Sequence, residues 1–170
     1  QDRHGRCAYA HLTFAQLEAA CERFCWGLSG LGVGPGTPTL LMVRPGLDFF
    51  ALTFAIFRLG AVPVLIDPGM GWRSFVRCVA QAQPEVLLGI PAAHVLRRLF
   101  PRAFRSIRIP VTLGRRFPFG GASTDAMSPA PGPFPVARVG NDDLAAVLFT
   151  TGSTGPAKGV QYTHRIFCTQ

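Results

Sequence analysis

A glycine- and hydroxyl-rich stretch near the end of the sequence has the composition of a phosphate-binding loop. It reads T-T-G-S-T-G-P-A-K-G from Thr150 to Gly159 and follows an apolar run. Its glycines allow backbone N–H groups to approach an anion closely. Its hydroxyl groups can donate hydrogen bonds to phosphate oxygens, Lys158 adds a positive charge, and no carboxylate is present. The residues that we predict to contact a polyphosphate are Thr150, Thr151, Gly152, Ser153, Thr154, Gly155 and Lys158.

Two other nucleotide-binding motifs do not fit the sequence. A Walker A loop requires Gly-Lys-Ser/Thr, whereas here Ala157 precedes the lysine and Gly159 follows it. The glycine-rich run from Gly30 to Gly36 does not match G-x-G-x-x-G, and it follows a helical pattern, where a C-cap and a turn explain it. Composition alone leaves open that the Thr150–Gly159 stretch is a surface turn that binds nothing.

The elements that must position this loop alternate between helices and strands. Thr13 and Gln16 have the spacing of a capping box, and apolar residues then recur at helical spacing as far as Gly30 or Gly32. We expect strands at 39–43, 62–66, 86–90, 107–113 and 144–149, and further helices at 48–59, 73–83 and 91–100. This alternation predicts an α/β fold with a mainly parallel sheet flanked by helices.

The segment 114–140 interrupts the alternation. It is rich in Gly, Pro and Ser and has no steady hydrophobic period, so we expect a flexible loop or a partly ordered linker. Beyond the phosphate-binding stretch, a new helix or strand is expected to begin near Thr163.

The stretch F-T-T-G-S-T-G-P-A-K-G-V from Phe149 to Val160, followed by Thr163 and His164, resembles the signature loop of the adenylate-forming superfamily. L-T-F-A-Q-L from Leu12 resembles an early segment of that superfamily, and L-G-A-V-P-V-L-I-D-P from Leu59 resembles a later one. Acyl-CoA synthetases, firefly-type luciferases and peptide-synthetase adenylation domains belong to the superfamily. The resemblance implies that the chain is the N-terminal part of the large domain of such an enzyme.

The resemblance implies a magnesium- and ATP-dependent ligase that activates a carboxylic acid as acyl-AMP, with the loop holding the β- and γ-phosphates. Residues 67–71, Arg77-Cys78 and 83–85 resemble the branch that makes β-lactones in bacterial olefin synthesis. That branch would activate a long-chain 2-alkyl-3-hydroxy fatty acid and close the ring through the substrate's own hydroxyl. A fatty acyl-CoA synthetase, in which a thiol attacks instead, is the alternative.

The resemblance also implies that residues 1–170 are a fragment of the adenylation domain. The adenine, acyl and metal contacts and a C-terminal domain with a catalytic lysine are expected beyond Gln170. We therefore assign no catalytic residue and no metal ligand within the chain and expect it to be inactive alone. Its expected partners are the fatty-acid substrate, the rest of the same enzyme and other olefin-pathway enzymes.

Positive charge gathers in one stretch of the sequence. The formal net charge is +8, every basic residue except Lys158 is arginine, and no acidic residue lies between Glu85 and Asp125. The stretch 97–116 contains seven arginines interleaved with phenylalanines. A solvated face or an interface with missing protein is one interpretation. A nucleic-acid-binding module is a second, although no RNP, KH or C₂H₂ pattern is present, and a peripheral contact with an anionic membrane is a third.

The remaining candidate residues give weaker signals. His164 is expected either near the substrate or at the start of a helix. His94 is interpreted as a packed or surface histidine rather than a base. The five cysteines form no C-x-x-C pair and are interpreted as apolar core residues in a reducing, cytoplasmic compartment. The apolar run 49–66 is interrupted by Arg58, so a buried helix and strand explain it better than a membrane span.

Overall fold

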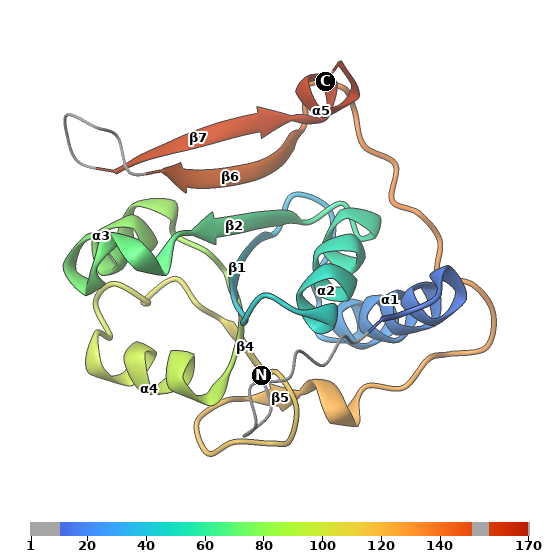
Figure 1. The fold of residues 1–170 in the computed structure, drawn as a ribbon, viewed down its shortest axis with the longest axis horizontal. Coiled ribbons are helices and arrows are strands. Elements are labelled where there is room, and N and C mark those ends of the chain that lie inside the picture. The colour runs from blue at the N-terminus through green and yellow to red at the C-terminus, as the bar shows by residue number, and fades with distance from the viewer. Residues whose placement is uncertain (1–10, 151–156, 170) are drawn as a thin grey trace, which may run out of the picture.

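The computed structural model describes residues 11–150 and 157–169. Within these residues, seven strands form one sheet in the order β5-β4-β3-β1-β2-β6-β7, and helices cover both of its faces (Figure 1). Neighbouring strands are parallel except β6 and β7, which are antiparallel. The predicted α/β fold with a mainly parallel sheet is therefore confirmed.

Each predicted strand and helix is present close to its expected position, and the structure adds short elements that the sequence did not predict. The strands are β1 (Pro38–Met42), β2 (Val62–Ile66), β3 (Val86–Gly89), β4 (Ile109–Thr112), β5 (Ala122–Ser123), β6 (Leu144–Thr150) and β7 (Lys158–Thr163). The α-helices are α1 (Phe14–Gly30), α2 (Leu47–Arg58), α3 (Trp72–Ala82), α4 (Pro91–Leu99) and α5 (His164–Cys168), and the 3₁₀ turns are η1 (Pro68–Met70) and η2 (Thr124–Ala126).

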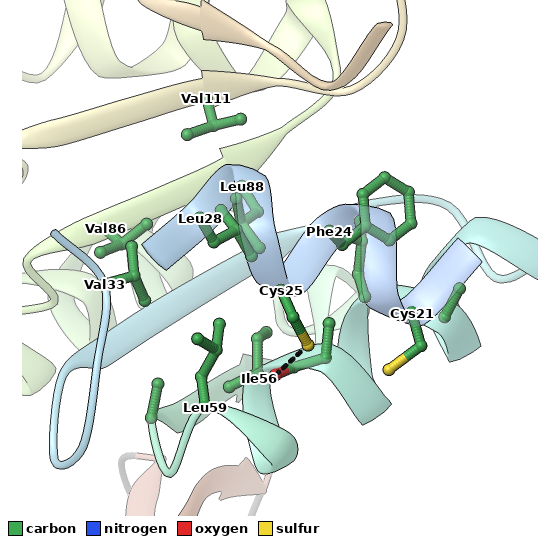
Figure 2. Packing of buried hydrophobic residues seen from close by; sticks show 14 of the residues in the cluster. Cys21, Phe24, Cys25, Leu28, Val33, Ile56, Leu59, Val86, Leu88 and Val111 are labelled. Carbon is green, nitrogen blue, oxygen red and sulfur yellow. Dashed lines mark hydrogen bonds between the residues drawn. The ribbon is translucent and has the colours of Figure 1, made fainter. Parts of the chain in front are cut away.

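Helix α1 begins at the predicted capping box. The hydroxyl of Thr13 accepts a hydrogen bond from the Gln16 amide at 3.2 Å, and the Gln16 side chain accepts one from the Thr13 amide at 2.9 Å. The apolar stripe that follows is buried against α2 and the sheet (Figure 2). In that stripe the Cys25 thiol donates to the Ala55 carbonyl at 3.6 Å. The sequence pattern therefore specified both the start of the helix and its buried face.

Three of the four described cysteines are core residues, as predicted. Cys21, Cys25 and Cys78 are buried. Cys168 is exposed on the short helix α5, so its interpretation as a core residue was wrong. Cys7 lies outside the described residues. Among the described residues, no helix combines the length and the hydrophobicity needed to cross a bilayer.

The two faces of the sheet have separate hydrophobic cores. Helices α1 and α2 pack on one face, with Phe24, Leu28 and Ile56 at the centre of the cluster. Helix α3 packs on the other face, where Phe75, Val79 and residues of the α4–β4 connection meet the sheet. Figure 1 shows α1 and α2 on the right and α3 and α4 on the left. Strands β1 and β3 are neighbours, and the helices that follow them, α2 and α4, cover opposite faces of the sheet. This arrangement creates a crevice at the carboxyl ends of the two strands.

The segment 114–140 is mostly irregular, but it contains β5 and η2 and packs on the α1–α2 side. Phe134 is buried, with its ring edge-on to Trp26 at 4.9 Å between ring centroids. Met127 covers Gly27 so closely that a Cβ at this glycine would overlap the methionine side chain. Arg58 donates to the Phe134 carbonyl through Nε at 3.0 Å and through Nη2 at 2.6 Å. These contacts tie the segment to the domain.

The end of the chain differs from the sequence-based expectation. Lys158 and Gly159 were expected in the loop, whereas strand β7 already begins at Lys158. The new element expected near Thr163 is helix α5, which begins at His164. The sequence K-G-V-Q-Y-T has little hydrophobic character of its own. It forms a strand because its backbone pairs with the edge of β6, with Val147 opposite Gln161 and Phe149 opposite Gly159.

Candidate functional site

Two residues of the predicted phosphate-binding loop lie opposite each other on the paired strands of the β6–β7 hairpin. Thr150, the last residue of β6, is the direct cross-strand partner of Lys158, the first residue of β7. Both residues are exposed. Because directly opposed residues of an antiparallel pair project from the same face, the Thr150 hydroxyl and the Lys158 ammonium group belong to one surface.

The structure brings together only part of the predicted site. Thr150 and Lys158 are described, whereas Thr151, Gly152, Ser153, Thr154 and Gly155 lie outside the described residues. Contacts of these five residues with phosphate therefore stay predictions. The hairpin fixes where the intervening chain must begin and end.

Strand β6 positions this hairpin at the carboxyl edge of the parallel sheet. Ala145, Ala146 and Phe149 are buried, which anchors β6 between β2 and β7. Since β6 is parallel to β2, with Phe149 opposite Ile66, both strands end at the same edge. Ligands of open parallel sheets bind beyond this edge.

Gly159 has a packing role that sequence analysis did not identify. Its own backbone lies under the Phe149 ring, and a Cβ added at Gly159 would be 2.9 Å from Phe149 Cζ. Phe149 is 4% exposed and belongs to the core on the α3 side. Gly159 therefore lets β7 lie against the Phe149 ring, and contact of its backbone amide with an anion stays a prediction.

An apolar cavity of about 650 Å³ adjoins Thr150. It lies at the carboxyl ends of β1, β2, β3 and β6 and extends to the first residues of α2 and α4. Its lining is mostly apolar, with Arg44, Asp67 and Thr150 as polar members. The Asp67 carboxylate already accepts a hydrogen bond from the Gly69 amide at 2.7 Å. This arrangement can hold the apolar part of a ligand whose charged part reaches the hairpin.

The cavity was not predicted from the sequence, although the sequence contains one signal for it. The predicted alternation of strands and helices implies a crevice wherever consecutive connections leave for opposite faces. Which strands flank the crevice depends on the order of strands in the sheet. That order results from long-range pairing, such as β1 with β3, and no local pattern reveals it.

The electrostatics of the hairpin suit an anionic ligand. The ion pairs formed by the described residues join Arg58 to Glu18 and Glu22, Arg108 to Glu85, and Arg165 to Asp142. None of these pairs includes Lys158. Its ammonium group therefore has no carboxylate partner within the described part of the chain and can neutralise an external anion.

His164 does not lie with Thr150 and Lys158. It is the first residue of α5, and its amide donates to the Asp143 carbonyl at 3.1 Å. Strand β7 separates it from Lys158, which corresponds to roughly 20 Å for six residues of extended chain. The structure confirms the helix-start interpretation, and proximity of His164 to a substrate stays a prediction.

His94 lies on α4 and is packed in the interior. Of the two interpretations, a packed or a surface histidine, the first is therefore confirmed. Its side chain is fully buried, and neither ring nitrogen forms a hydrogen bond of good geometry. Burial lowers the pKa of His94 below 6.5, and the nearby Arg97 guanidinium lowers it further, while backbone groups of Gly89 and Val111 oppose the change in part. His94 is therefore neutral at physiological pH.

The described residues offer no protein-built metal site. No group of three or more His, Cys, Asp or Glu side chains lies close enough together to hold an ion within residues 11–150 and 157–169.

Comparison with known proteins gives a consistent set of matches. The family model for AMP-binding enzyme matches residues 3–170. A protein of Stenotrophomonas maltophilia named olefin beta-lactone synthetase is 47% identical over 171 residues, which cover 98% of this chain and 31% of that protein. A protein of Xanthomonas campestris with the same name is 42% identical over 170 residues, which cover 98% of this chain and 30% of that protein.

A solved structure shares the fold. The crystal structure of ATP-bound MatB from Rhodopseudomonas palustris superimposes with a TM-score of 0.72 at 25% identity, over 90% of this chain and 30% of that one. The chain thus spans about 30% of the length of the curated relatives that it matches.

Proposed function

Because this chain belongs to the AMP-binding enzyme family, we propose that it forms the ATP-phosphate-binding part of an adenylate-forming ligase. The observation that supports this role best is the pairing of Thr150 with Lys158 at the carboxyl edge of the sheet. A hydroxyl and an ammonium group on one surface, with the loop between them, suit a polyphosphate. The related MatB was solved with ATP bound, which supports the same nucleotide for this chain.

The proposed reaction begins with attack of the substrate carboxylate on the α-phosphorus of ATP. The bond from this phosphorus to the bridging oxygen breaks, so acyl-AMP forms and pyrophosphate leaves. Thr150 would donate a hydrogen bond to a phosphate oxygen, and Lys158 would neutralise part of the leaving charge. Such groups act mainly by position and preorganised charge. The Phe149–Gly159 contact would support them by fixing β7 against β6.

We propose a long-chain 2-alkyl-3-hydroxy fatty acid as the substrate. The names of the two relatives at 47% and 42% identity support a β-lactone as the product. The apolar cavity beside Thr150 would suit a hydrocarbon chain near the activated carboxyl group. The 3-hydroxyl oxygen would attack the acyl carbonyl, AMP would leave, and the hydroxyl proton would pass to solvent as the four-membered ring closes.

Magnesium would enter this site with the nucleotide. The described residues form no cluster of metal ligands, and phosphate oxygens of the nucleotide would help to coordinate the ion. When bound, magnesium would neutralise phosphate charge. We further propose that the enzyme acts in the cytoplasm, where this chain would associate with the rest of its own polypeptide and with other olefin-pathway enzymes.

Pyrophosphate release by the full-length enzyme tests this function. The enzyme would be given ATP with a simple, a 3-hydroxy or a 2-alkyl-3-hydroxy fatty acid, each with and without coenzyme A, and products would be identified by mass spectrometry. We expect release with the 2-alkyl-3-hydroxy acid and a β-lactone without coenzyme A. Release that requires coenzyme A and yields a thioester would indicate a fatty acyl-CoA synthetase instead.

A further inference from the structure

Arginines of α3 and of the α4–β4 connection gather around one surface hollow. The hollow has a volume of about 540 Å³, and its lining includes Arg73 and Arg77 of α3 and Arg102 after α4. Leu99 and Phe100 supply apolar lining between them. Basic and apolar residues that are separated in the sequence thus line the same hollow. We define the arginine–aromatic surface by Trp72, Arg73, Arg77, Arg98, Leu99, Phe100, Arg102 and Phe119.

Large apolar side chains project from this surface into solvent. Leu99 is 67% exposed, Phe119 61% and Trp72 56%. Trp72 packs at its base against Phe100, with 5.4 Å between ring centroids. Guanidinium groups lie over two of the exposed rings: Arg73 is 5.2 Å from the Trp72 ring, and Arg98 is 5.0 Å from the Phe119 ring. The surface therefore places exposed apolar side chains next to positively charged guanidinium groups.

Within residues 11–150 and 157–169, the arginines of this surface have no carboxylate partner. The ion pairs of the described residues involve Arg58, Arg108 and Arg165, and none includes an arginine of the surface. The sequence supplies no carboxylate between Glu85 and Asp125. Arginine binds phosphate through paired N–H donors, and its charge persists at any physiological pH. The positive charge is therefore available to an external anion.

We propose that the arginine–aromatic surface binds the anionic phospholipid surface of a membrane. The guanidinium groups contact lipid phosphates, while Trp72, Leu99 and Phe119 enter the interfacial region. An aliphatic tip such as Leu99 gains from a hydrocarbon environment but cannot stack on a nucleobase. The exposed rings already have a guanidinium group over them, which leaves less of each ring for a base. A lipid surface thus suits the surface better than a nucleic acid.

The surface has a geometric relation to the proposed substrate. Ala93 and Leu96 of α4 line the apolar cavity at the carboxyl edge, and Leu99 lies three residues further along the same helix. A membrane bound at Leu99 would bring an apolar acid to the side of the molecule on which the cavity lies. This use of the surface rests on the proposed function, whereas lipid binding itself does not.

Vesicle flotation of the full-length enzyme tests the proposal. Vesicles of phosphatidylcholine alone would be compared with vesicles that also contain phosphatidylglycerol, each at low and high salt. The test variants are Leu99→Ser and the double variant Arg77→Ala with Arg102→Ala. Arg138→Ala is the matched control, because Arg138 lies outside the arginine–aromatic surface. Melting temperatures of all variants would establish that they fold.

We expect binding to the anionic vesicles that weakens as salt rises. At roughly fivefold for each arginine near a charged membrane, the double variant should weaken this binding by about 25-fold, and Arg138→Ala should leave it unchanged. Leu99→Ser should weaken the binding that persists at high salt. Equal binding by the double variant and the wild type would overturn the proposal. So would tighter, salt-sensitive binding to an oligonucleotide than to the vesicles.

The lipid proposal and the proposed function can fail separately. Pyrophosphate release would be measured without vesicles, using a short, soluble 2-alkyl-3-hydroxy acid. Release without vesicle binding would overturn the membrane-binding proposal and leave the proposed function intact. Vesicle binding without release would support the surface and count against the proposed reaction.

Discussion

Thr150 of β6 and Lys158 of β7 are direct partners across the antiparallel end of the sheet. The two chain ends of the predicted phosphate-binding loop are therefore held side by side, and their exposed polar groups share one surface. Each of them can be changed separately, because neither belongs to the buried core.

Replacing Lys158 should impair use of ATP. Lys158→Met keeps an unbranched stem but removes the charge, and we expect kcat/KM for ATP in the full-length enzyme to fall by about 10²–10³, as for other groups that stabilise developing charge. Pyrophosphate release at varied ATP concentrations would measure this. Lys158→Arg, which keeps the charge, should retain more activity than Lys158→Met, and equal activity of the two variants would argue against a charge role.

Replacing Thr150 should show whether its hydroxyl, rather than the volume of its side chain, contributes to binding of ATP. Thr150→Val removes the donor at nearly constant volume, and loss of one hydrogen bond to a charged group should raise KM for ATP about tenfold. Thr150→Ser keeps the hydroxyl and should behave like the wild type. Steady-state kinetics of both variants would measure KM for ATP. If the hydroxyl does not contact a phosphate, Thr150→Val and Thr150→Ser should not differ.

Adding a methyl group to Gly159 should destabilise the domain. The new Cβ would lie 2.9 Å from Phe149 Cζ, and overpacking a core contact costs about 1–3 kcal/mol of the free energy of unfolding. Urea unfolding of full-length Gly159→Ala would measure the loss. Gly30→Ala is the control, because an added Cβ there meets nothing within 4 Å. A smaller loss when Phe149→Leu is also present would confirm that the ring causes the clash.

Arg58 should hold the 114–140 segment on the domain. Its side chain is 15% exposed, pairs with Glu18 and Glu22, and donates twice to the Phe134 carbonyl. Arg58→Met should therefore lower the free energy of unfolding by about 2 kcal/mol. Hydrogen exchange at the Ala137 amide, which donates to the Arg58 carbonyl, should become faster. Exchange as slow as in the wild type would show that the segment docks without this side chain.

His94 should make stability depend on pH on the acid side of neutrality. Burial holds its pKa in the folded state below 6.5, so the unfolded chain binds this proton more readily. Stability is unaffected above about pH 6.5 and falls as pH decreases below that value towards the folded-state pKa. Unfolding of the wild type and His94→Gln across this range would measure the difference. The wild type should lose more stability on acidification, and parallel curves would contradict this account.

Much of the fold could be predicted because its signals are local. The capping box at Thr13 and the stripe from Cys21 to Leu28 specify α1 through neighbouring residues. The strands β1, β2 and β3 are short, almost fully buried apolar runs between turn residues. These patterns depend on burial alone, which a sequence displays directly.

The features that could not be predicted depend on distant partners. Strand β7 has an exposed, mixed sequence and forms only because β6 is beside it. Strand β5 has two residues and exists through its pairing with β4. The role of Gly159 requires the Phe149 ring above it, and the cavity requires β1, β2, β3 and β6 to end together. Of the candidate site, the sequence revealed the residue types, whereas the structure revealed how Thr150 and Lys158 are paired.

The most direct test of the central claim is a crystal structure of the full-length enzyme with a non-hydrolysable ATP analogue. The distances to measure run from Lys158 Nζ and Thr150 Oγ1 to the oxygens of the β- and γ-phosphates. We predict hydrogen-bonding distances for both groups. A polyphosphate bound elsewhere, for example over the arginine–aromatic surface, with the hairpin turned away from it, would contradict the account.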